Sequence, residues 1–169
     1  IKRAADKSLI TKDRMRAELV TEFFTKVPPE AKAVSTAAQT LGNRTLDPEH
    51  LKEVVAGRFA DALGEVAAKM TLDEIQENRG QFVKEVAKIA NESIGHTGLA
   101  LETVSIISLD QAPIEMFNPA NTFDSQGLTQ LTEQIESRKK KRNDITQDTK
   151  ISIENKNLET IQKELEIKK

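Results

Sequence analysis

The last quarter of the sequence contains neither of the residues that break helices. The last proline is Pro119 and the last glycine is Gly127, so the 42 residues from 128 to 169 contain neither. Because proline and glycine are the residues least compatible with a helix interior, we predict one long helix here. A lone helix this rich in charge is marginally stable in water, so we expect it to pack against other helices.

Apolar residues of this predicted helix form two short seams, each with a three-then-four spacing. The seams consist of Leu128, Leu131 and Ile135, and of Leu158, Ile161 and Leu165. This spacing is typical of the a and d positions of a coiled coil. The phase is broken between the two seams, so no single heptad register continues through the helix. We hypothesise that these six residues form the interface of a parallel homo-oligomer.

Five consecutive cations, Arg138 to Arg142, lie between the two seams. Such a run could contact anionic lipid headgroups or nucleic acid. On a helix, however, five consecutive residues point around more than one turn and form no single basic face. Glu136 also lies four residues before Lys140, within reach of an ion pair. We favour a solvated helix with ion pairs, some of them between subunits, over a lipid or partner contact. The net charge of −2 gives no reason to expect binding to nucleic acid.

The first part of the sequence begins with a strand pattern. Residues 15 to 27 alternate between apolar or small side chains and charged ones, which predicts a strand with one buried face. The segment Leu9–Thr11 is expected to pair with it in a hairpin. Pro28 and Pro29 end the strand, because proline cannot donate a hydrogen bond to a sheet.

Helices are predicted next, followed by another strand. Pro29 is expected at the first position of a helix over residues 30–40, and the pair Asp47-Pro48 should begin a longer one. A capping box at Thr71–Glu74 starts a short helix, and a further helix is expected at about 80–94. The segment Leu99–Leu109 is apolar and β-branched, which predicts a strand covered on both faces.

The sequence offers no constellation suited to catalysis or to metal binding. It contains no cysteine, which excludes disulfides, thiolate metal sites and a cysteine nucleophile. His50 and His96 are expected in surface and turn positions. Asp73 and Glu74 are adjacent on a helix and point apart. No glycine-rich phosphate loop is present. We therefore predict no catalytic residue, no cofactor and no metal, and no enzyme activity.

Four segments of the sequence resemble the band 7, or SPFH, domain of stomatins, prohibitins and flotillins. They are the strand at 13–27, the segment 36–45, the helix at 48–70 that leads into 71–75, and the strand at 98–106. The segment from Ala37 to Thr45 is the most specific part. The sequence is most similar to bacterial flotillin-like membrane proteins, in which a linker like Phe117-Asn118-Pro119 and a charged helix follow the domain. The turn at Asp13-Arg14 departs from the family, because it lacks the usual glycine or asparagine.

The resemblance implies an α+β fold, in which a small sheet with packed helices precedes a long coiled-coil helix. We expect an SPFH domain at 1–111, a linker at 112–124 and a helical stalk at 125–169. The family resemblance implies a non-catalytic scaffold that forms homo-oligomers and organises membrane microdomains. The alternative is a prohibitin-like regulator that docks on a membrane-bound protease.

The resemblance also implies a membrane-associated protein on the cytoplasmic face. No stretch of this sequence is apolar over the roughly 20 residues that a spanning helix needs. Because the sequence starts at Ile1 rather than at methionine, we interpret it as a fragment. We expect membrane lipids to be bound by a segment outside it, and membrane proteins to be possible clients.

Overall fold

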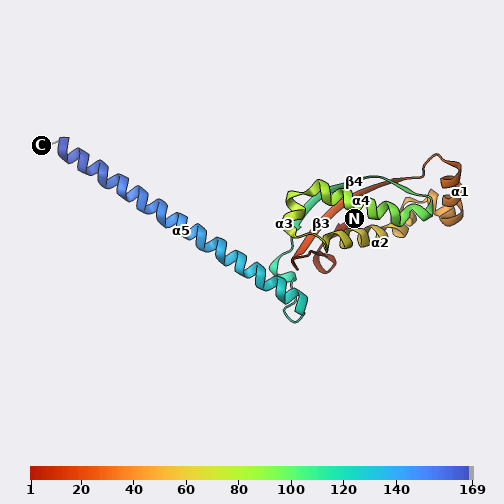
Figure 1. The fold of residues 1–169 in the computed structure, drawn as a ribbon, viewed down its shortest axis with the longest axis horizontal. Helices are drawn as coiled ribbons and strands as arrows, with labels where there is room; N and C mark the ends of the chain where they lie inside the picture. The colour runs from red at the N-terminus through yellow and green to blue at the C-terminus, as the bar shows by residue number, and fades with distance from the viewer. Residues whose placement is uncertain (168–169) are drawn as a thin grey trace. The chain divides into compact units, whose positions relative to one another are not determined.

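A computed structural model describes residues 1–167, apart from the side chains at positions 6 and 45. It divides the chain into two compact units, Ile1–Leu128 and the residues from Thr129 onward. The first unit is an antiparallel sheet with helices packed on it, and the second is the greater part of one helix (Figure 1). The α+β fold with a long C-terminal helix is therefore confirmed.

The sheet is organised around one long strand, β3 (Arg16–Lys26). Strand β4 (Ala100–Gln111) pairs with β3 along its whole length. The two-residue strands β1 (Lys2–Arg3) and β2 (Leu9–Ile10) pair with the first half of β3 on its other side. The predicted alternation of β3 and its hairpin with β2 are confirmed. Strand β1 was missed, because two residues are too few to form a pattern.

The prediction that β4 is covered on both faces is wrong. Its side chains alternate irregularly between buried and exposed, and Ile107 is 57% exposed on the face away from the helices. The register between β3 and β4 shifts at Val20/Thr21 and again at Phe24/Thr25. Each shift inserts one extra residue into β4, and an extra residue reverses the faces of all the residues that follow. Apolar residues therefore fall together in the sequence although only one face of the strand is buried.

Four helices lie between β3 and β4. They are α1 (Ala31–Thr40), α2 (Pro48–Ala67), α3 (Leu72–Glu77) and α4 (Arg79–Ile94). Asp47 caps α2 as predicted, because its side chain accepts from the Glu49 N–H at 3.0 Å. The capping box of Thr71 and Glu74 is also confirmed. Pro29 does not occupy the first position of α1: it precedes the capping residue Glu30, so that helix begins later than predicted.

The core lies between the helices and one face of the sheet. Leu19 of β3, Leu63 and Val66 of α2, and Phe82 and Val86 of α4 are almost fully buried there. Towards the other end of α2, the rings of Phe23 and Phe59 stack with their centroids 4.3 Å apart. Short 3-10 turns connect the elements: η1 (Ala5–Lys7), η2 (Gly42–Leu46), η3 (Gly95–Thr97) and η4 (Ile114–Met116).

The last element is α5 (Thr122–Ile167), which confirms the predicted long helix through residue 167. The remainder of the predicted stalk, residues 168 and 169, lies outside the described residues. Among residues 1–167, none of the helices combines the length and the apolar character needed to cross a bilayer.

Candidate functional site

The first turn of α5 is attached to the sheet by a buried ion pair. Arg16 of β3 donates from Nε to Asp124 Oδ1 at 2.9 Å and from Nη2 to Oδ2 at 2.8 Å. Asp124 is 2% exposed and also accepts from the Asn118 N–H at 3.1 Å. The hydrogen bonds from Arg16 are the main reason why the pKa of the Asp124 carboxyl lies below its usual range. The third guanidinium nitrogen, Arg16 Nη1, donates to Ser8 Oγ at 3.2 Å.

A glycine close to this ion pair allows α5 to approach the turn that precedes β3. A Cβ atom added to Gly127 would lie 2.1 Å from the carbonyl oxygen of Arg14. Arg14 itself has a positive φ of 61°, and its guanidinium carbon lies 4.7 Å above the centre of the Phe123 ring. Arg14 therefore adopts the left-handed backbone conformation that glycine and asparagine adopt more readily, although its turn contains neither of them.

The segment predicted as a linker at 112–124 extends into the first turn of α5 and contains buried residues. Ala112, Phe117 and Asp124 are each at most 4% exposed, and the Ala112 N–H donates to the Arg16 carbonyl at 2.8 Å. The domain limits at 111 and 124 stay predictions. Sequence reasoning missed the ion pair because its partners are 108 positions apart and neither stands in a motif.

The six residues of the two predicted seams differ in exposure. Leu128 is half-buried and Leu131 is buried. The others are exposed: Ile135 by 46%, Leu158 by 57%, Ile161 by 53% and Leu165 by 62%. At about 100° per residue, the second seam is rotated by about 120° from the first around the helix axis. Helix α5 therefore presents apolar residues on two different faces.

The basic run 138–142 is exposed along its whole length. Lys139 Nζ lies 3.9 Å from Glu136 Oε1, so the ion pair of Glu136 involves Lys139 and not Lys140 as predicted. Both side chains are more than half exposed, and such surface pairs contribute little to stability.

The titratable residues considered as chemical candidates have ordinary structural roles. His50 Nδ1 lies 2.8 Å from Asp47 Oδ2 at the start of α2. A ring nitrogen of His96 contacts Arg58 Nη1, which also donates to the Ser93 carbonyl. Backbone hydrogen bonding at Thr71 lowers the pKa of Glu74, in keeping with its capping role. Among residues 1–167, with the side chains at positions 6 and 45 set aside, no three or more potential metal ligands form a group.

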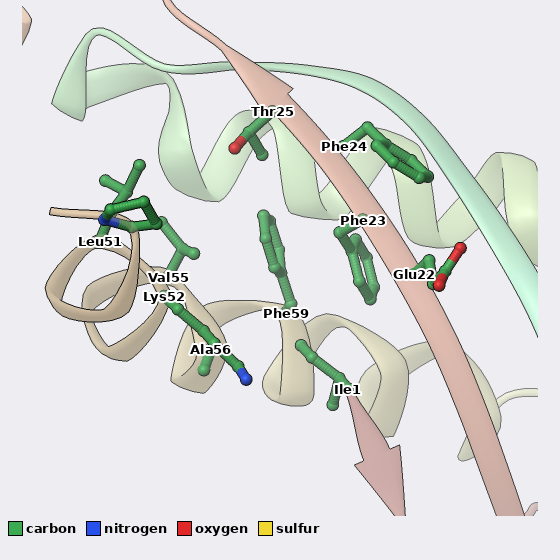
Figure 2. A pocket seen from close by; sticks show the side chains of 11 residues that line it. Ile1, Glu22, Phe23, Phe24, Thr25, Leu51, Lys52, Val55, Ala56 and Phe59 are labelled. Atoms are coloured by element: carbon green, nitrogen blue, oxygen red, sulfur yellow. The ribbon is translucent and has the colours of Figure 1, made fainter. Parts of the chain in front are cut away.

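A groove of about 370 Å³ lies between the second half of β3 and α2 (Figure 2). Its apolar wall includes the stacked Phe23 and Phe59 together with Leu51 and Val55. Lys52 is among its polar residues, and Ile1 lies at one end of it (Figure 2). Sequence reasoning missed this groove, because its residues come from separate elements and form no motif.

Comparison with known proteins yields one family and two relatives. The family described as SPFH domain / Band 7 family matches residues 3–167. The chain is 44% identical over 167 residues to the flotillin family inner membrane protein YqiK of Escherichia coli K12. It is 27% identical over 168 residues to the flotillin family inner membrane protein sll1021 of Synechocystis. Each match covers 99% of this chain but only 30% and 25% of the relatives' lengths.

Proposed function

This chain belongs to the SPFH domain / Band 7 family, and we propose that it is a non-catalytic scaffold that associates with itself at a membrane. Both relatives are named as inner membrane proteins of the flotillin family, and neither the family description nor those names denote an enzyme. We extend the proposal to the organisation of membrane microdomains on the cytoplasmic face. Membrane lipids would be reached through a segment outside residues 1–169.

The observation that carries the proposal is the pair of apolar seams on α5. Ile135, on one face, and Leu158 and Leu165, on another, are each about half exposed or more. Exposed leucine and isoleucine at a and d spacing normally pack against a second helix. Two straight helices contact each other along one face, so seams about 120° apart need two neighbours. We therefore propose assemblies of more than two copies.

Sedimentation velocity of the chain over a wide range of concentrations tests this proposal. The double variant Leu158→Lys, Leu165→Lys places charge on the second seam and should shift the distribution to smaller species. The matched control Asn155→Lys, Gln162→Lys adds the same charge at exposed positions that lie on the face of neither seam, and it should sediment like the parent chain. A parent chain that stays monomeric at every concentration, or a control that dissociates as readily, would contradict the proposal.

A further inference from the structure

Strand β3 has an unpaired edge along its second half. On one side of β3, the Thr21 N–H donates to the Ile1 carbonyl at 2.8 Å; on the other, the Arg16 carbonyl accepts from Ala112. Backbone groups of successive strand residues point to opposite sides. Phe23 and Thr25 therefore direct their N–H and C=O groups to the β1 side. Within residues 1–167, β1 and β2 are the strands on that side, and they reach only the first half of β3.

The groove between β3 and α2 runs beside this edge. Figure 2 shows open space between the second half of β3 and the side chains of α2, with Ile1 and the start of β1 at one end. The stacked rings of Phe23 and Phe59, with Leu51 and Val55, give the groove an apolar surface. Apolar side chains from an added strand would bury that surface.

The amino group of Ile1 lies at the point where the pairing with β3 stops. Its nitrogen donates to the Thr21 carbonyl, which is the bond that an internal peptide nitrogen would make in the same register. The pKa of this amino group is lowered from 8.0, chiefly by burial and next by the nearby charge of Lys52. The surroundings of this nitrogen therefore disfavour an ammonium ion, whereas an uncharged peptide N–H carries no such penalty.

We propose that the edge of β3 and the groove hold a strand that continues β1 in the amino-terminal direction, formed by residues joined to Ile1 in a longer polypeptide. The β1–β3 register pairs the second residue before Ile1 with Phe23 and the fourth with Thr25. Both side chains lie on the same face as Ile1, towards the groove, so both should be apolar. This strand fixes the preceding polypeptide against α2 and covers an edge that would otherwise be open to other chains. The inference does not depend on self-association through α5.

Two versions of the chain, each extended by four residues before Ile1, test the register. Val-Thr-Val-Thr places both valines towards the groove, whereas Thr-Val-Thr-Val has the same composition but places them on the opposite face. Native-state hydrogen exchange should slow by about tenfold or more at the Phe23 and Thr25 amides of the first version only. Unchanged exchange in both versions, or equal protection in both, would overturn the proposal.

A variant in the wall of the groove tests whether the added strand places its side chains in the groove or only pairs with the edge of β3. Ala56 of α2 lines the groove and is half-buried, so Ala56→Lys introduces a charge there without removing a large core side chain. With Val-Thr-Val-Thr attached, this variant should lose most of the protection at Phe23 and Thr25. Circular dichroism of the unextended variant checks that it folds. A folded variant that keeps full protection would show that the added strand does not use the groove.

Discussion

Arg16 of β3 and Asp124 of α5 form a buried, two-pronged ion pair across 108 residues of sequence. Arg16 is the first residue of the central strand, and Asp124 lies in the first turn of the long helix. Their side chains are 14% and 3% exposed, so water does little to screen either charge. The pair ties the beginning of α5 to the sheet within the first compact unit.

Replacing Asp124 with alanine should strongly destabilise this unit. The change leaves the Arg16 guanidinium largely buried without its carboxylate partner, and breaking a buried pair in this way typically costs about 3–5 kcal/mol. Denaturant unfolding measures the loss. The control Glu102→Ala removes the partner of Lys26 in a pair whose side chains are both 54% exposed, and should cost at most about 1 kcal/mol. An equal loss of unfolding free energy in the two variants would show that the buried pair stabilises the unit no more than the exposed one.

The same ion pair predicts how stability depends on pH. The pKa of Asp124 is lower in the folded chain than its ordinary value of 3.8. The unfolded chain therefore takes up a proton at this position first as the pH falls. The stabilisation is complete above the unfolded pKa and is lost as the pH falls through the folded one.

Urea unfolding of the parent chain and of Asp124→Asn from neutral to acidic pH measures this dependence. The difference in free energy of unfolding between the two chains should be largest near neutral pH and should shrink below about pH 4. A difference that stays constant with pH would show that the charge of Asp124 contributes nothing.

Two glycine-to-alanine changes should have opposite effects. A methyl group at Gly127 would lie 2.1 Å from the Arg14 carbonyl oxygen, so the backbone must move and Gly127→Ala should destabilise the chain. At Gly64, inside α2, nothing lies within 4 Å of the added atom. There alanine favours the helix by about 0.5–1 kcal/mol. Thermal unfolding should show a lower midpoint for the first variant and an unchanged or higher one for the second.

Local sequence patterns predicted most helices and strands of this fold, but they did not predict the contacts between residues that are distant in the sequence. Alternation identified β3, and the side chains of Asp47 and Thr71 marked the starts of α2 and α3. The two register shifts in β4 could not be predicted from the sequence, because a bulge is defined only by the pairing of a strand with its partner. For the same reason, nothing around Arg16 indicated Asp124, and nothing around Phe23 indicated the groove that it lines with Phe59.

Breaking the seams of α5 one at a time should reveal how many neighbours each helix has. If parallel copies pack first seam to first seam and second to second, each chain binds one neighbour through each face. Charging the face of the first seam uses Ile135→Lys and Ile153→Lys, which lie about five turns apart on the same side of the helix. This double variant, or Leu158→Lys with Leu165→Lys on the second seam, should then leave dimers, and only the fourfold variant should be monomeric. Sedimentation equilibrium distinguishes these species. Monomers from either double variant would instead show that the first seam of one copy packs on the second seam of the next. Every contact would then include one seam of each kind, so charging either kind would break all the contacts.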